Sequence, residues 1–145
     1  MKITIRQDPS AGETEVLVLC REINAEIEEI VSQIGLAGKV MVGRQGDETF
    51  FIPVSDVLYL ESVDGKIFFY TDGEMYESTQ RLYQLEEMLA KTTFARVSKT
   101  TIANLSKMRS IKPIGGSRLA ATMLNGEKVQ VSRAYVAEIK KKLGV

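Results

Sequence analysis

The 145 residues carry no histidine, one cysteine and a formal net charge of zero, with 44% apolar and 26% charged residues. The missing histidine removes the commonest general base and the usual zinc ligands, and a single cysteine allows no internal disulfide. No apolar run approaches the ~18 residues of a membrane span, and the N-terminus has no apolar signal core. We expect one cytoplasmic, uncleaved chain with no enzymatic activity, small-molecule substrate, metal or cofactor, and with Cys20 as a small buried apolar residue.

The first 40 residues predict two short strands and one amphipathic helix. Residues 2–7 alternate polar and apolar residues, and residues 15–20 form an apolar run after a Pro/Gly turn cluster. In residues 21–35 apolar residues recur at spacings of three and four, which predicts a helix that Gly35 ends. Its apolar face comprises Ile23, Ile27, Ile30, Val31 and Ile34, and its other face carries Glu22, Glu26, Glu28 and Glu29.

Strand-like periodicity replaces the helical pattern beyond Gly38. We therefore expect a boundary within residues 35–41, between an extension (1–40) and a domain (41–145). Short runs rich in Val, Ile, Phe and Tyr predict strands over residues 39–44, 48–53, 57–63, 66–71 and 74–78. The pairs Asp64-Gly65 and Asp72-Gly73 supply the positive φ angles of tight hairpins, which indicates antiparallel pairing.

Two helices and three further strands follow. Residues 78–91 predict a helix behind a Ser/Thr cap, with Leu82, Leu85, Met88 and Leu89 on one face. Strands are expected over 109–114, 118–124 and 128–131, separated by Gly115-Gly116 and Asn125-Gly126 turns, before a last helix over 132–143. The predicted fold is mainly β, with antiparallel sheets, short helices and a β/α extension in front.

The acidic residues and the glycine pairs do not form a recognisable catalytic or nucleotide site. Most paired acids fall at predicted turns or strand ends, where they are expected for solubility and turn geometry. Residues 43–46 and 115–118 lack the Gly-Lys-Ser/Thr continuation of a phosphate loop.

Charge is distributed unequally along the chain. Residues 96–145 hold eleven Lys and Arg against two acids, Glu127 and Glu138, a net charge of +9, so residues 1–95 carry −9. Such asymmetry indicates either a nucleic-acid or other anionic partner, or a solvated basic face.

Within the basic third, polar donors gather where strands meet loops or helices: residues 96–101, 116–118 and 132–133. A serine that begins a helix presents free backbone N–H groups to a phosphate, and Lys or Arg can donate to guanine O6 and N7. Structural roles are the alternative: capping by Ser98 and Ser132, complementing a helix C-terminus by Lys140 to Lys142, and simple solvation of Arg118.

Three blocks of residues 41–145 occur in an order that resembles the LytTR family of bacterial DNA-binding domains. They are Leu60-Glu61-Ser62 before a turn, Phe94-x-Arg96-x-Ser98-Lys99-x-x-x-x-Asn104, and Asn125-Gly126-x-x-Val129-x-Val131-Ser132-Arg133 leading into a terminal helix. The resemblance implies a sequence-specific transcription regulator that binds double-stranded DNA through loops in successive major grooves. It also implies stacked antiparallel sheets and dimers on paired repeat sites.

The resemblance assigns the DNA contacts residue by residue. Bases would be read by Lys66 (or its neighbours Asp64 and Gly65), Lys99 and Arg133. The DNA backbone would be held by Arg96, Ser98, Thr100, Asn104, Arg118 and Ser132. Arg96 and Asn104 have an alternative role, bracing the loop, while Ile102, Leu105 and Met108 would anchor the stretch to the sheets.

Residues 1–40 resemble the extension of stand-alone LytTR regulators without a receiver domain, in which control comes from a membrane-bound partner protein or from self-association. The isoleucine-rich helix is then either a homodimer or partner surface, or a cover for an open sheet face. The alternative function is a β-rich protein-interaction module that regulates another protein without binding DNA. A steep loss of DNA affinity with salt separates the two functions.

Overall fold

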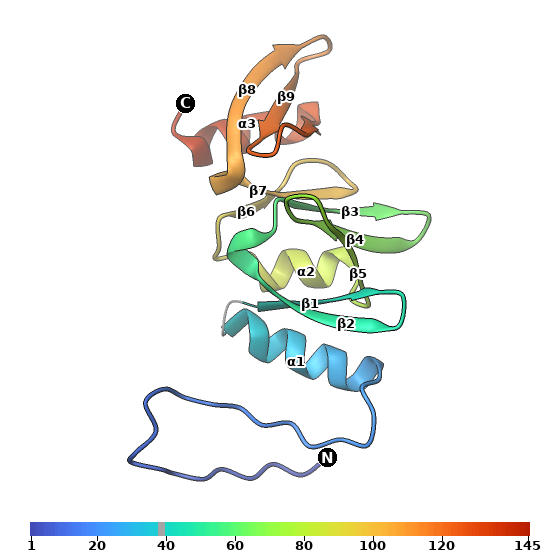
Figure 1. Cartoon of the computed structure of the whole chain (residues 1–145). Coiled ribbons are helices and arrows are strands. Elements are labelled where there is room, and N and C mark those ends of the chain that lie inside the picture. The colour runs from blue at the N-terminus through green and yellow to red at the C-terminus, as the bar shows by residue number, and fades with distance from the viewer. Residues whose placement is uncertain (38–39) are drawn as a thin grey trace.

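The computed structural model describes residues 1–37 and 40–145, which form two antiparallel sheets and three α-helices (Figure 1). The helices are α1 (Ala25–Ala37), α2 (Leu82–Met88) and α3 (Arg133–Leu143). The strands are β1 (Val40–Gln45), β2 (Glu48–Pro53), β3 (Tyr59–Val63), β4 (Lys66–Tyr70), β5 (Met75–Ser78), β6 (Phe94–Arg96), β7 (Thr101–Asn104), β8 (Met108–Ile114), β9 (Arg118–Met123) and β10 (Lys128–Val131). The prediction of a mainly β fold is confirmed.

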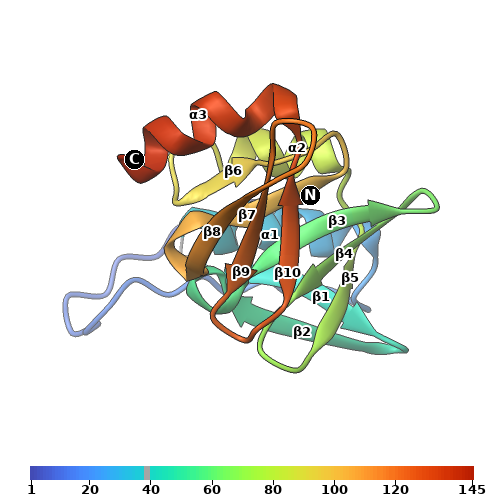
Figure 2. The ribbon, with the colours of Figure 1, turned by 90° about the horizontal axis from the view of Figure 1, so that it is seen from above.

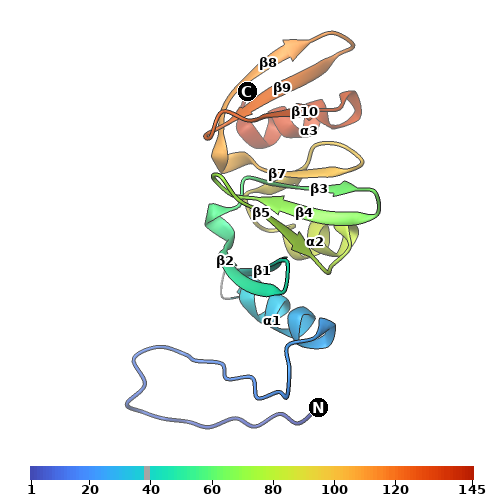
Figure 3. The same ribbon diagram turned by 45° about the vertical axis from the view of Figure 1, so that its right-hand side comes forward.

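The sheets stack on one another with one apolar core between them, and a second core lies between the seven-stranded sheet and α2. One sheet has seven strands in the order β2-β1-β5-β4-β3-β7-β6, and the other has the order β10-β9-β8. Successive β7 residues point to opposite faces: Ile102 packs with Leu85 of α2, while Ala103 packs with Ile139 of α3 in the core between the sheets. Figure 3 shows the resulting stack, from α1 at one end to the three-stranded sheet and α3 at the other.

The predicted hairpin between β3 and β4 is confirmed. Val63 pairs with Lys66, and the intervening Asp64 and Gly65 have φ angles of 51° and 77°. Both central residues are in the left-handed region, as a two-residue hairpin requires, and Asp and Gly adopt it at low cost. This turn holds Lys66 at the exposed tip of the hairpin.

Strands β6 and β7 were not predicted as strands. Polar residues obscure the pattern, since Thr101 and Asn104 are buried in β7 with its apolar residues. β7 nevertheless lies between β3 and β6 in the larger sheet. Its polar side chains are tolerated where hydrogen bonds satisfy them, which sequence periodicity does not register.

Residues 1–24 depart from the prediction. Neither residues 2–7 nor residues 15–20 form a strand, and Cys20 is exposed rather than buried. Figure 1 shows the segment as a loop beyond α1, away from the sheets. A strand needs a partner for its backbone, and residues 1–20 make no hydrogen bond to the rest of the described chain.

Helix α1 confirms the predicted helix but corrects its details. Asn24 accepts a hydrogen bond from the Ile27 N–H through Oδ1 (3.1 Å), which starts the helix, and the helix passes Gly35 to Ala37. Glu28, assigned to the solvated face, is only 5% exposed and lies 3.7 Å from the Arg44 guanidinium of β1. The expected boundary within 35–41 includes residues 38–39, which lie outside the described residues.

Helix α2 is shorter than the predicted 78–91. Leu82, Leu85 and the C-cap residue Leu89 are buried as predicted, Met88 is half-buried, and no Ser or Thr caps the helix. Instead the Arg81 N–H donates to Oε1 of Gln84 (2.8 Å). Among the helices that the structure describes, none combines the length and apolarity needed to cross a bilayer.

Candidate nucleic-acid interface

Three of the predicted contact stretches are joined by backbone hydrogen bonds. In the loop between β6 and β7, the Thr100 carbonyl accepts a hydrogen bond from the Ser62 N–H (2.8 Å). The Val97 carbonyl accepts one from the Ser132 N–H (2.8 Å). One bond ties the loop to the β3–β4 hairpin and the other to the start of α3. The three stretches consequently lie on one side of the molecule (Figures 1 and 2).

The three predicted base readers occupy these stretches. Lys66 begins β4, Lys99 lies at the tip of the β6–β7 loop, and Arg133 begins α3, and all three are exposed. Of the ion pairs between described residues, none involves these three side chains. Their positive charges are therefore free to meet an anionic partner.

A shallow groove of about 380 Å³ runs between the loop and β10. Ser98, Thr100 and Ser132 line it, and the Thr100 N–H donates to Oγ of Ser98 (3.2 Å), which orders the loop. Ser98 belongs to no helix, so the capping alternative for Ser98 is wrong. Ser132 occupies the N-cap position of α3, but its hydroxyl caps no N–H in the described helix.

Lys128 and Gln130 also line this groove, although the sequence analysis did not single them out. They alternate along β10 with the buried Val129 and Val131. Polar and apolar residues alternate in residues 128–131. This alternation could have predicted that both side chains lie on the exposed face of the strand.

Two tyrosines beside the groove remain neutral hydroxyls. Burial and the Glu127 carboxylate raise the pKa of Tyr59, while burial and the Glu61 carboxylate raise the pKa of Tyr70. Tyr70 donates to Oε1 of Glu61 at 2.6 Å, and its ring stacks on Tyr59 with a centroid separation of 4.5 Å. The hydrogen bond from Tyr70 holds the Glu61 carboxylate at the edge of a surface that is otherwise rich in hydrogen-bond donors.

Arg118 lies next to the same junction. Sheet register pairs Leu119 with Val131, so Arg118 neighbours Ser132 across the strands. Its Nε donates to the Gly115 carbonyl (2.6 Å), which fixes the side chain across the β8–β9 turn. Arg118 as a whole residue is half-buried rather than fully solvated.

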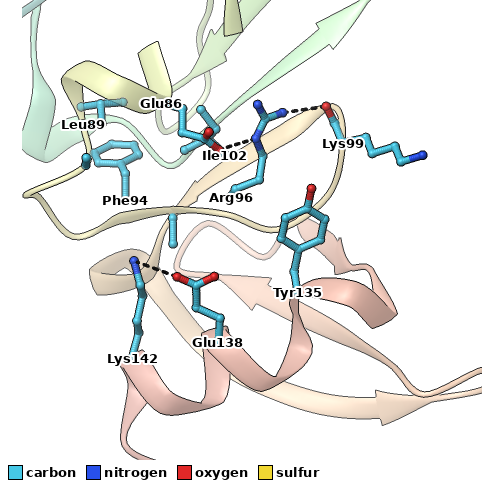
Figure 4. A pocket seen from close by; sticks show the side chains of 11 residues that line it. Glu86, Leu89, Phe94, Arg96, Lys99, Ile102, Tyr135, Glu138 and Lys142 are labelled. Atoms are coloured by element: carbon cyan, nitrogen blue, oxygen red, sulfur yellow. Dashed lines mark hydrogen bonds and ion pairs between the residues drawn. The ribbon is translucent and has the colours of Figure 1, made fainter. Parts of the chain in front are cut away.

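Arg96 has internal partners at both ends of its guanidinium (Figure 4). Nε donates to Oε2 of Glu86 on α2 (2.6 Å), and Nη1 donates to the Lys99 carbonyl (2.6 Å). Arg96 and Lys99 both line a groove of about 550 Å³ between α2 and α3, and the side chain of Lys99 points away from Arg96 in Figure 4. These contacts favour the bracing role over a phosphate contact.

Asn104 is 1% exposed, and its side chain makes four hydrogen bonds. Its Nδ2 donates to the Val57 carbonyl (3.0 Å), and Oδ1 accepts from the Ser106 N–H (3.2 Å) and the Thr93 hydroxyl (2.6 Å). No surface remains on this side chain for a phosphate, so the structure again favours bracing. Ile102 is a buried anchor as expected, and Leu105 and Met108 are half-buried against the core between the sheets.

Residues 1–37 and 40–145 contain no group of three or more His, Cys, Asp or Glu placed to hold a metal ion. The interface therefore consists of cations, hydroxyls and amides on loops tied to a rigid sheet, and such groups suit a phosphate backbone and base edges.

Comparison with known proteins identifies the same family that the sequence motifs resemble. The model of the LytTr DNA-binding domain matches residues 47–144. A sensory transduction protein LytT of Enterococcus faecalis is 33% identical over 102 residues, 70% of this chain and 42% of that protein. This chain thus spans less than half the length of that relative.

Two further matches extend the comparison. A solved LytTr DNA-binding domain from Bacillus cereus has a TM-score of 0.70 and 30% identity, covering 74% of this chain and 98% of that one. An uncharacterized HTH-type transcriptional regulator of Staphylococcus aureus is 22% identical across 100% of this chain and 99% of its own length. The second match includes residues 1–46, which the family model leaves out.

Proposed function

Because the chain belongs to the LytTR family of DNA-binding domains, we propose that it is a bacterial transcription regulator that reads a specific DNA sequence through Lys66, Lys99 and Arg133. The observation that carries the proposal is the pair of backbone hydrogen bonds that joins the three stretches bearing these residues. A rigid spacing between readers is what simultaneous contact with bases in successive major grooves requires.

Phosphate contacts would come from the smaller donors around the readers. Ser98, Thr100 and Ser132 line one groove, and Arg118 adjoins it. Hydroxyls and backbone N–H groups of this kind set the register of a protein on DNA, while bidentate Lys or Arg contacts to guanine supply about 1–3 kcal/mol of discrimination each. We assign Arg96 and Asn104 to bracing rather than to phosphate binding.

We further propose that the regulator binds paired repeat sites as a homodimer. Two copies on two repeats double the number of bases read, and the net charge of +9 in residues 96–145 favours approach to the duplex. Residues 1–40 would then be available for self-association or for a membrane-bound regulatory partner.

Titration of random-sequence duplex at several salt concentrations tests DNA binding itself. Each neutralised phosphate lowers log K by about 0.9 for every decade of salt, so several contacts predict a steep fall in affinity. A flat response would instead support the protein-interaction module. Binding sites selected from random DNA would supply the specific duplex and reveal the spacing of the repeats.

Arg133→Ala tests base readout. We expect it to weaken binding to the selected site by about 1–3 kcal/mol and to weaken binding to random duplex much less. Lys141→Ala is the matched control, because Lys141 is an exposed cation at the other end of the same helix. Equal losses on both duplexes would demote Arg133 to a phosphate contact.

A further inference from the structure

The strongest unexplained feature is an apolar N-terminal segment that nothing covers. Among the side chains that the structure describes, fourteen large apolar ones are exposed; seven of these lie within residues 1–23, and each of the seven is more than half exposed. Exposed apolar residues are normally scattered, so this concentration indicates a surface that is buried in an assembly. The members are Met1, Ile3, Ile5, Val16, Leu17, Leu19 and Ile23.

Helix α1 presents a second uncovered surface next to this segment. Its buried contacts are polar: Glu28 pairs with Arg44, and the Ser32 hydroxyl donates to Oε1 of Gln80 (2.9 Å). The isoleucine stripe lies about 150° around the helix from these two residues. Within the helix Ile27, Ile30 and Val31 are half-buried and Ile34 is 37% exposed, whereas Ile23 precedes the helix and belongs to the segment.

Residues 1–7, at the start of the segment, are complementary in charge to the helix. Lys2 and Arg6 flank Ile3 and Ile5, whereas the exposed Glu26 and Glu29 border the isoleucine stripe. An extended segment laid along the stripe would place two cations beside two carboxylates. The segment and the helix therefore match as the two halves of one interface.

We propose that residues 1–24 of one copy pack on α1 of a second copy, so that the chain forms a two-fold dimer without DNA. The proposal names the interface of the dimer invoked above, yet it rests on residues 1–37 and not on the DNA-reading loops. Residues 16–20 are apolar at every position, and a strand of this kind is buried on both faces. The isoleucine stripe of one helix can cover only one face of such a segment. A dimer supplies two helices and two segments, so the second face can be covered as well.

The available apolar surface is sufficient for a dimer. Seven largely exposed side chains at about 100 Å² each amount to ~700 Å² per copy, close to the ~800 Å² per partner of a standard stable interface. In the dimer, residues 1–20 would also gain the backbone hydrogen-bond partners that the described chain does not give them.

Sedimentation of the full 145-residue chain without DNA gives the first test. We expect a dimer at micromolar concentration, a monomer for Leu17→Asp combined with Leu19→Asp, and an unchanged dimer for the control Leu124→Asp. Leu124 is a similarly exposed leucine, 54%, in the turn between β9 and β10. A wild-type monomer at about 100 μM, or a double variant that still dimerises, would overturn the proposal.

Charge exchange separates packing on a second copy from packing on the chain's own helix. Lys2→Glu with Arg6→Glu, and Glu26→Lys with Glu29→Lys, should each weaken the homodimer by like-charge repulsion. Mixing the two variants should restore dimers, because each segment then meets a complementary helix in the other copy. Failure of the mixture to pair would refute the second-copy arrangement.

DNA binding distinguishes this failure from failure of the proposed function. The Leu17→Asp, Leu19→Asp monomer should keep Arg133-dependent binding to a single half-site and lose tight binding to the paired site. If the wild type were monomeric and still bound the half-site through Arg133, the proposed dimer interface would be refuted, whereas the proposed base readout would be supported.

Discussion

Asn104 and Arg96 show at the residue scale that polar side chains in a basic stretch need not face the partner. Asn104 makes four side-chain hydrogen bonds, to Val57, Thr93 and Ser106, inside the sheet. Arg96 connects α2 to the loop that presents Lys99. Both side chains hold the β6–β7 loop in position. Substituting them should therefore lower the stability of the fold or shift the loop, and should not remove phosphate contacts.

Asn104→Ala should lower the free energy of unfolding by about 1–3 kcal/mol, because the Val57 carbonyl and the Thr93 hydroxyl lose their buried partner. Urea denaturation measures the change. Asn125→Ala is the matched control: its Oδ1 accepts from the exposed Glu127 N–H at a turn (3.0 Å), and we expect a loss of less than about 1 kcal/mol. Equal costs would show that burial does not decide the role of Asn104.

Glu86→Gln tests whether Arg96 positions Lys99. The substitution weakens the bond to Arg96 Nε, so we expect lower affinity for the selected DNA site with an unchanged salt slope. If Arg96 contacted a phosphate instead, removal of the nearby carboxylate would strengthen binding, and Arg96→Ala would reduce the slope by about one. Fluorescence anisotropy at three salt concentrations separates the two results.

At the element scale, strand positions are decided by neighbours that lie far away in the sequence. β1 occupies the space between β2 and β5, where Gly43 meets the Phe69 ring and the Tyr76 side chain. β7 likewise carries buried polar residues because β3 and β6 enclose it. The alternation of residues 39–44 predicted the strand β1, but it could not reveal this close approach.

Gly43→Ala should destabilise the protein by about 1–3 kcal/mol, because an added Cβ would lie 2.7 Å from Cβ of Tyr76 and closer still to the Phe69 ring. Gly12→Ala is the control, since no heavy atom lies within 4 Å of a Cβ there, and its effect should stay within about 0.5 kcal/mol. The urea concentration at the midpoint of unfolding, measured for each variant and for the wild type, gives the two changes in stability. A neutral Gly43→Ala would mean that β1 shifts to make room.

The basic residues of the whole molecule concentrate in its C-terminal third, while the acidic excess is spread over residues 1–40 (−3) and 41–95 (−6). Residues 1–95 carry −9 and residues 96–145 carry +9, and Figure 3 places α1 at the opposite end from the three-stranded sheet and α3. The neutral total is therefore no obstacle to a basic interface. The acidic end repels a duplex only when the Debye length is comparable with the size of the protein.

Replacement of Glu22, Glu26 and Glu29 by Gln should raise the affinity for random duplex in ~0.01 M salt, where the Debye length is about 30 Å. At ~0.15 M, where it is about 8 Å, the effect should vanish. The monomeric Leu17→Asp, Leu19→Asp background removes any contribution from self-association. No change in low salt would show that the acidic end does not restrain nonspecific binding.

The sequence by itself determined the mainly β class, most strands, the three helices and the family, because these depend on local periodicity, turn residues and motif spacing. Only the tertiary structure decided which polar residues are buried and which apolar residues are exposed. Asn104 and Glu28 turn inward because packed neighbours satisfy them, while Ile3, Leu17 and Cys20 stay exposed because residues 1–20 make no hydrogen bond to the rest of the described chain. Burial depends on contacts between distant segments, and local pattern does not contain that information.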